Sequence, residues 1–67
     1  MWLARDEEGS INLFMSKPEL IQVLDDGEPC RYWQSDNKEL PLSKEMYPEV
    51  TYTNSPVEVV LKSDLFL

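Results

Sequence analysis

The side chains that could take part in chemistry here are thirteen carboxylates and one thiol, because the chain contains no histidine. The commonest general base and metal ligand is therefore absent, and neither a Ser-His-Asp nor a Cys-His arrangement can be built. Adjacent carboxylates at residues 7–8 and 25–26 could supply the acid and base of a glycosidase, but they fall in predicted turns, where solvated carboxylates are normal. We expect no catalytic residue and no enzymatic activity.

The other candidates for chemistry lack a supporting pattern. Cys30 lies next to Arg31, which could activate a thiol, but a buried and inert cysteine is the commoner case. Neither acidic turn continues with the alternating oxygen ligands and late glutamate of a calcium loop. The only two glycines, Gly9 and Gly27, stand far apart, so no glycine-rich phosphate loop exists. The sequence predicts no metal and no cofactor.

The net charge of the chain limits the kinds of molecule that it can bind. Thirteen acidic and six basic residues give a formal net charge of −7. The basic residues are scattered, whereas binding to bare nucleic acid requires a basic patch, so we expect no direct contact with DNA or RNA. The acidic charge either keeps the protein soluble or imitates a phosphate backbone and occupies a basic protein.

Length and cysteine usage bear on size and compartment. A chain of 67 residues has room for one modest core, since a domain near this size buries only about 60% of the surface its unfolded form exposes. One unpaired cysteine fits a reducing cytosol better than secretion. No stretch approaches the roughly 18 apolar residues of a membrane span. We expect a cytoplasmic protein without membrane association, folded as one small β domain over residues 1–67, with 63–67 as a tail that can fray.

The clearest element is a β-hairpin over residues 2–14. Asp6 and Gly9 occupy the first and fourth positions of a type I turn, where aspartate can bond its own backbone and glycine accepts a positive φ. A left-handed glycine after such a turn is a common bulged connection. With Asp6 facing Ser10, the predicted cross-strand pairs are Arg5 with Ile11, Ala4 with Asn12, Leu3 with Leu13, and Trp2 with Phe14.

Neither face of this hairpin is polar enough to be solvated. One face carries Trp2, Ala4, Asn12 and Phe14, and the other carries Leu3, Arg5, Ile11 and Leu13. A solvated antiparallel sheet normally has one apolar and one polar side. Because both faces of this hairpin carry apolar side chains, we expect other residues to cover both. The rest of the chain could fold over them as a curled sheet or small barrel, or one aromatic face could stay open for a partner or a second copy.

The segment 17–24 is ambiguous between a helix and a strand. Residues 16–19 spell a capping-box pattern with an early proline, which favours a short helix. Two helical turns are marginal, however, and residues 20–24 could equally be extended before the turn at 25–27. We expect the helix and keep the strand as the alternative.

Further along, β-forming residues predict a second hairpin. Residues 29–34 and 39–41 flank a turn at 36–37, which sets Trp33 opposite Leu40 and Tyr32 opposite Pro41. Residues 42–48 read as a connector with one helical turn at most. Extended segments at 50–53 and 57–61 complete a mainly β fold of about five short antiparallel strands.

Two stretches carry a family resemblance. They are the opening W-L-A-R-D-x-x-G-S-x-x-L-F followed by Lys17-Pro18, and the run M-Y-P-E-V-T-Y-T-N-S-P-V-E-V-V-L over residues 46–61. Together they resemble a group of short proteins of Bacteroides-type gut bacteria and their phages, in which a segment close to L-F-P-E-V-T-W-E-N-S-P recurs. The resemblance spans about half of the chain, is strongest over 48–56 and departs over 19–28. It implies a small bacterial or phage protein and carries over no activity.

Together these observations predict a non-enzymatic interaction or accessory protein that binds a protein partner or itself through an aromatic sheet face or an edge strand. The candidate surface residues are Trp2, Phe14, Tyr32, Trp33, Leu65 and Phe66. One alternative is an acidic inhibitor that mimics nucleic acid and occupies a basic protein. A weaker one is a tail that binds the DNA polymerase sliding clamp, because residues 64–66 resemble the end of that docking peptide, although Lys62 and Ser63 depart from it.

Overall fold

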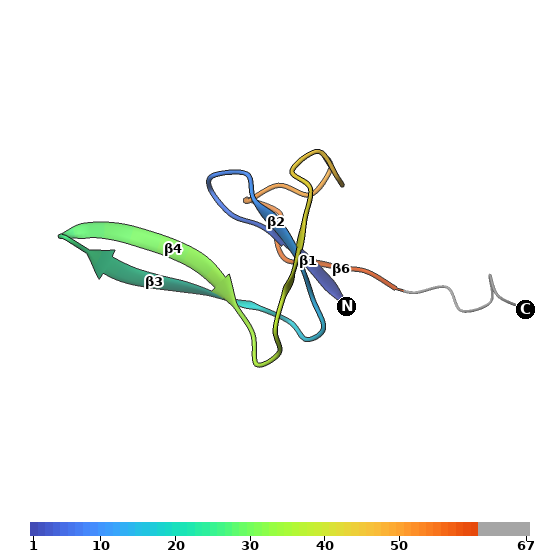
Figure 1. Cartoon of the computed structure of the whole chain (residues 1–67), viewed down its shortest axis with the longest axis horizontal. Coiled ribbons are helices and arrows are strands. Elements are labelled where there is room, and N and C mark those ends of the chain that lie inside the picture. Colours follow the sequence, from blue (N-terminus) through green and yellow to red (C-terminus); the bar gives the residue numbers. More distant parts are fainter. Residues whose placement is uncertain (61–67) are drawn as a thin grey trace, which may run out of the picture.

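The chain forms two antiparallel β-sheets in a computed structural model that describes residues 1–60 (Figure 1). The strands are β1 (Trp2–Arg5), β2 (Ile11–Phe14), β3 (Glu19–Asp25), β4 (Glu28–Gln34), β5 (Leu40–Leu42) and β6 (Val57–Glu58). Four of them form an open sheet in the order β5-β2-β1-β6, and β3 pairs with β4. No helix occurs among the described residues. The predicted mainly β fold is confirmed, as a curled sheet rather than a closed barrel.

The β1–β2 hairpin has the predicted turn and register. The Gly9 amide donates to the Asp6 carbonyl at 3.1 Å, and Gly9 has a φ of 100°. One Asp6 carboxylate oxygen accepts the amides of Glu8 and Ser10 at 2.9 and 3.0 Å. All four predicted cross-strand pairs, from Trp2 with Phe14 to Arg5 with Ile11, are present. Local turn chemistry therefore defines this hairpin.

The helix expected over 17–24 is wrong, and the extended alternative is correct. Strand β3 turns back into β4 through Asp26 and Gly27, whose φ values of 51° and 81° are those of a type I′ turn. A helix of two turns would gain few hydrogen bonds, whereas the ladder from Asp25 with Glu28 to Glu19 with Gln34 pairs seven residues on each strand.

The predicted second hairpin is also wrong. Trp33 lies opposite Leu20 and Tyr32 lies opposite Ile21, because β4 pairs with β3 rather than with residues 39–41. Those residues contribute to β5, which pairs with β2 and places Leu40 opposite Leu13. Strand β4 thus pairs with β3, which precedes it in the chain. The predicted turn at 36–37 had instead paired it with residues 39–41, which follow it.

Residues 43–56 connect β5 to β6 through successive turns. The Met46 amide donates to the Ser43 carbonyl at 3.0 Å, and the Val50 amide donates to the Tyr47 carbonyl at 2.9 Å. The extended segment expected over 50–53 is therefore wrong, because Val50 closes a turn there. The strand expected over 57–61 is found only as β6, which pairs with the edge of β1.

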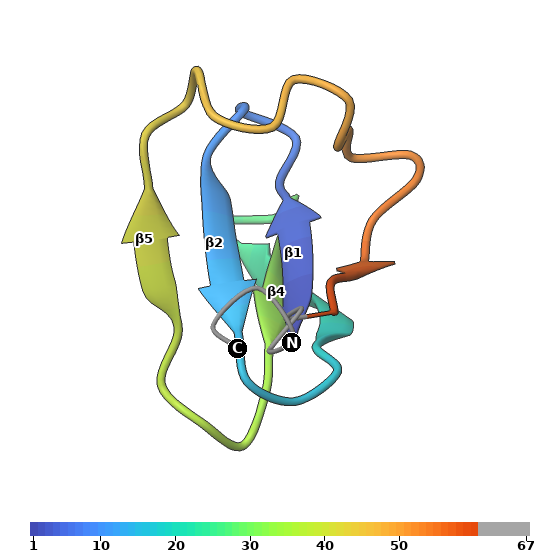
Figure 2. The same ribbon diagram turned by 90° about the vertical axis from the view of Figure 1, so that its right-hand side faces the viewer.

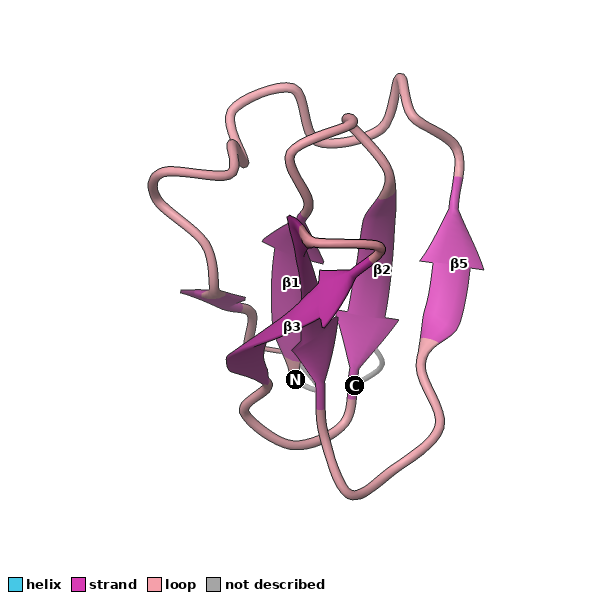
Figure 3. Ribbon diagram, turned by 90° about the vertical axis from the view of Figure 1, so that its left-hand side faces the viewer, coloured by secondary structure: helices cyan, strands magenta, loops and turns pink. Residues whose placement is uncertain are grey.

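Both faces of the β1–β2 hairpin are covered by the rest of the chain. On one face Leu3 and Ile11 pack with Val50, and the half-buried side chains around them are Leu13, Leu42, Val57 and Val59. On the other face Ala4 and Phe14 are each 1% exposed. The base of the β3–β4 hairpin crosses on that side, as Figures 2 and 3 show from opposite directions. The hairpin is therefore the core, and neither of its faces is left open.

Candidate functional site

The β3–β4 hairpin, residues 19–34, projects from the four-stranded sheet, and we call it the arm (Figure 1). Four of its large apolar side chains are exposed: Leu20 (44%), Val23 (43%), Leu24 (74%) and Tyr32 (40%). Exposed apolar side chains that gather on one element typically mark an interaction surface. The arm is therefore the part of the described structure best placed to contact another molecule.

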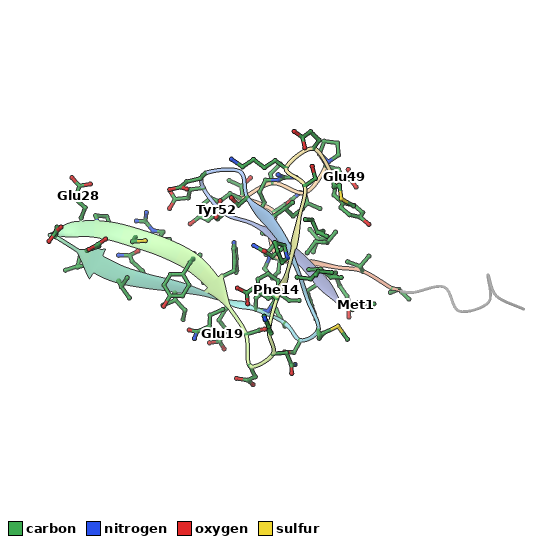
Figure 4. The ribbon with its side chains drawn as sticks, viewed as in Figure 1. Met1, Phe14, Glu19, Glu28, Glu49 and Tyr52 are labelled. Carbon is green, nitrogen blue, oxygen red and sulfur yellow. The ribbon has the colours of Figure 1, made fainter. Side chains whose placement is uncertain are left out.

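The register of the arm separates its side chains into two faces. Directly opposed residues share a face, so Trp33 lies beside Leu20 and Arg31 lies beside Gln22 on what we call the inner face. The outer face carries two cross-strand pairs, Ile21 with Tyr32 and Val23 with Cys30. Carboxylates bound it at both ends, with Glu19 at the base and Asp25 and Glu28 at the tip, where Figure 4 shows Glu19 and Glu28. The outer face is thus a short apolar stripe framed by negative charge.

The inner face anchors the arm to the sheet. The Trp33 indole nitrogen donates to the Arg5 carbonyl at 3.0 Å, and the Trp33 ring meets the edge of Tyr52 with centroids 6.4 Å apart. Nearer the tip, Arg31 forms an ion pair with Glu7 at 3.3 Å and donates to the Gln22 amide oxygen at 2.9 Å. The arm is therefore held at its root by a half-buried tryptophan. Beyond the root, Val23 and Tyr32 of the outer face and Leu24 of the inner face are exposed.

Arg5 organises the structure that carries the arm. Its guanidinium donates to five backbone carbonyls: Val50 (2.6 Å), Gly9 (2.6 Å), Lys44 (3.1 Å), Met46 (2.9 Å) and Tyr47 (3.0 Å). Hydrogen bonds from a charged donor are stronger than neutral ones, and the planar guanidinium presents five N–H groups in fixed directions. Arg5 thereby fixes the segment 44–50 against the β1–β2 turn. Because its donors are already used by the backbone, its role is structural.

The structural role of Arg5 was not predicted, although the sequence contains one indication of it. On the predicted hairpin Arg5 shares a face with Leu3, Ile11 and Leu13. A charged group on an apolar face requires partners that satisfy it. The identity of those partners could not be read from the sequence, because the carbonyls of residues 44–50 carry no signal in their side chains.

Of the six residues predicted as an interaction surface, the four within the described range do not gather on one exposed face. Phe14 is 1% exposed, so its assignment to the surface is wrong; it is the last residue of β2 and is labelled in Figure 4. Trp2 and Trp33 are half-buried, and the Lys17 ammonium lies 5.4 Å from the centroid of the Trp2 ring. Tyr32 is exposed on the outer face. Leu65 and Phe66, and with them the clamp-binding tail, lie outside the described residues.

The geometry gives no support for chemistry by the acidic residues. Glu7 and Glu8 lie exposed in the first turn, and Asp25 and Asp26 lie exposed at the tip of the arm. Within residues 1–60 no three potential metal ligands come together. A hydrogen bond from the Ser43 hydroxyl, reinforced by a backbone amide, lowers the pKa of Glu45. That carboxyl is fully exposed on a turn, so the shift reflects local turn geometry.

Comparison with known proteins gives no match: no protein family fits the chain, and no curated protein and no solved structure is detectably similar. The resemblance to short proteins of gut bacteria and phages stays a prediction. Within the described range, no helix has the length and apolar character to cross a membrane. Function must therefore be argued from the arm and its surroundings.

Proposed function

We propose that this protein is a non-enzymatic binding module that presents the arm to a protein partner. The observation that carries the proposal is the contrast within the arm between an anchored root and an exposed outer face. Trp33 is hydrogen-bonded to the β1 backbone, whereas Val23 and Tyr32 are 43% and 40% exposed. Such a framework holds an apolar surface in place before binding, which lowers the entropy cost of association.

The composition of the outer face fits contact with protein. Tyrosine is enriched among the residues that dominate binding energy, and Tyr32 has Ile21 directly opposite it. Cys30 lies on the same face beside Val23 and is exposed, so the expectation of a buried cysteine is wrong. Together these four side chains form an apolar patch whose burial against a partner is favourable. The patch is small, so a chain of net charge −7 that carries it can stay soluble.

The test compares two substitutions that each replace an exposed apolar side chain by serine. Val23→Ser changes the outer face, and Met15→Ser changes a side chain that is 61% exposed outside the arm. The immobilised full chain is expected to retain a specific protein from a lysate of its source cells, and Val23→Ser should abolish retention while Met15→Ser leaves it intact.

Two results contradict the proposal. One is equal retention by both variants, which would place binding elsewhere. The other is loss of the partner only when the tip carboxylates Asp25 and Asp26 are changed to their amides, which would favour an acidic mimic of nucleic acid. Circular dichroism of each variant establishes that the β-sheet signal is unchanged.

A further inference from the structure

We propose that the outer edge of β3 takes up an extended segment of the partner as an additional strand, and that this segment is apolar in its middle and carries lysine or arginine at both ends. The inference rests on the proposed function, because it uses the same arm. It specifies the edge that binds, the backbone groups that pair and the charge of the partner. Strand addition is a general way in which a sheet edge recognises an extended peptide.

The two edges of the arm differ in their surroundings. Beside β4 lies the β1–β2 turn, to which Arg31 is tied by its ion pair with Glu7, and the residues of both segments line a shared hollow. Pro29 also removes one amide donor from β4. Among the described residues β3 pairs with β4 alone, and Figures 1 and 3 show no strand along its other side. Of the two edges, β3 is the one open to a new strand.

The register identifies the backbone groups that an added strand would meet. In a type I′ turn the Asp25 carbonyl accepts the Glu28 amide, so this pair is of the hydrogen-bonded kind. Hydrogen-bonded and non-hydrogen-bonded pairs alternate along an antiparallel ladder. The amides and carbonyls that point away from β4 are therefore those of Leu20, Gln22 and Leu24. Pro29 lies opposite Leu24, where β4 needs no amide for this ladder, in agreement with this alternation.

The open edge lacks the features that normally prevent strand pairing. Sheet edges are protected by proline, lysine, bulges or short length. Strand β3 runs for seven residues, Glu19–Asp25, contains no proline or lysine and is charged only at its two end residues, and its ladder to β4 contains no bulge. Its central residues are mostly apolar on both faces, so an added strand would bury side chains above and below the sheet.

Charge indicates which strand is added. Glu19 and Asp25 stand at the two ends of β3, and Asp26 follows in the turn. The cations nearest to β3 in sequence are already engaged: Lys17 lies over the Trp2 ring, and Arg31 contacts Glu7 and Gln22. A partner with a cation at each end would complement these carboxylates in either strand direction.

A second copy of the chain is a poorer occupant by the same argument. Antiparallel pairing of two β3 strands about Gln22 would place Glu19 opposite Asp25 of the other copy, twice. Like charges directly opposite each other destabilise a sheet. Two chains of net charge −7 also repel each other over a longer range.

The first experiment uses two synthetic peptides with blocked ends, Lys-Thr-Val-Thr-Val-Thr-Lys and Glu-Thr-Val-Thr-Val-Thr-Glu, titrated into the 15N-labelled full chain. We expect the lysine peptide to bind at least about five-fold more tightly at low salt, and the ratio to approach one in 0.5 M NaCl as screening increases. On binding, the amides of Leu20, Gln22 and Leu24 should become protected from hydrogen exchange. Equal affinity of the two peptides at low salt, or protection elsewhere, overturns the proposal.

The second experiment uses a matched pair of variants, Gln22→Pro and Gln22→Ala. Both remove the contact of the Gln22 side chain with Arg31, but only proline removes the outward amide, and no hydrogen bond to β4 is lost. We expect Gln22→Pro to weaken binding of the lysine peptide at least about ten-fold and Gln22→Ala to change it less than two-fold. Unchanged β4 amide shifts establish that the arm stays folded, and Leu24→Pro repeats the test at the position opposite Pro29.

Three results separate failure of this inference from failure of the proposed function. If Val23→Ser abolishes partner capture while Gln22→Pro does not, the arm binds through its outer face, and strand addition is overturned. If neither substitution affects capture, the proposed function is contradicted as well. If light scattering shows a dimer that Gln22→Pro dissociates, the occupant of β3 is a second copy, which overturns the assignment of a basic partner.

Discussion

The two hairpins of this chain are alike in local geometry and opposite in environment. Each reverses direction at a glycine with positive φ, Gly9 in one and Gly27 in the other, and each pairs its strands without a gap. Yet Leu3, Ala4, Ile11 and Phe14 of β1–β2 are at most 3% exposed, whereas Leu20, Val23, Leu24 and Tyr32 of the arm are at least 40% exposed. A hairpin therefore becomes a core or a projecting arm according to whether the remaining chain covers it.

The β1–β2 hairpin is covered mainly by residues that lie far from it in the sequence. Strands β5 and β6 add to the two edges of β1–β2, and Val50 closes one face. Arg5 holds the segment that carries Val50, through hydrogen bonds to its carbonyls. The arm receives no such cover in residues 1–60, which leaves its outer face and the β3 edge available. The following predictions test that division.

The largest expected effect is on the packing of the first hairpin. Phe14→Ala deletes a large side chain that is 1% exposed and should lower the free energy of unfolding by about 3–5 kcal/mol. A domain of this size has roughly 3–5 kcal/mol of stability, so the variant should be largely unfolded at 25 °C. The matched change in the arm, Leu24→Ala, should cost less than about 0.5 kcal/mol. Urea titration followed by tryptophan fluorescence measures both.

The next effect concerns the two arginines. Arg5→Lys keeps the charge but replaces the five-donor fork by a point charge, and we expect a loss of about 2 kcal/mol. Arg31→Lys, in an exposed ion pair with Glu7, should change stability by less than about 0.5 kcal/mol. Similar losses for both substitutions, measured in the same urea titration, would mean that Arg5 does not organise the fold.

A smaller effect distinguishes global from local stability. Gly9→Ala and Gly27→Ala each force an alanine into positive φ at about 1–2 kcal/mol, and an added Cβ meets nothing within 4 Å at either site. The cost is therefore conformational in both. Gly9→Ala should lower the urea midpoint of the whole domain. Gly27→Ala should leave that midpoint nearly unchanged and accelerate amide exchange only in β3 and β4. Equal midpoint shifts would contradict a separable arm.

The same division explains how much of the fold was predictable. The β1–β2 register followed from Asp6 and Gly9, because turn residues fix a hairpin through contacts close in sequence. Strand β3 could not be predicted in this way, because Leu20, Ile21 and Leu24 suit the apolar stripe of a helix as well as a strand. Pairing of β5 with β2 joins residues far apart in the chain, and no local residue type encodes it.

The candidate site was predictable only in kind. An aromatic or apolar surface on a β-element was expected, and Tyr32 is part of it. Phe14 was misplaced because the sequence could not show that the rest of the chain buries its face of the first hairpin. The open β3 edge could not be found while residues 17–24 were assigned to a helix, since an edge exists only once a strand is recognised.

The smallest expected effect is a pH dependence in the connection between β5 and β6. The Ser43 hydroxyl lowers the pKa of Glu45, so its contribution to stability is present above the ordinary carboxyl pKa and is lost as pH falls through the lowered value. Ser43→Ala should raise the pKa of Glu45 toward its ordinary value. Titration of the side-chain carboxyl by 13C NMR measures the shift, and an unchanged pKa in Ser43→Ala would contradict the assigned cause.

The most direct test of the division between a closed hairpin and an open arm is amide hydrogen exchange in the full chain without any partner. We expect the amides of Leu20, Gln22 and Leu24 to exchange at nearly unprotected rates, because they point to solvent. Over the same period the hydrogen-bonded amides of β1 should exchange only through global unfolding. Protection of those three β3 amides equal to that of β1 would show that the edge is already covered and would contradict the account.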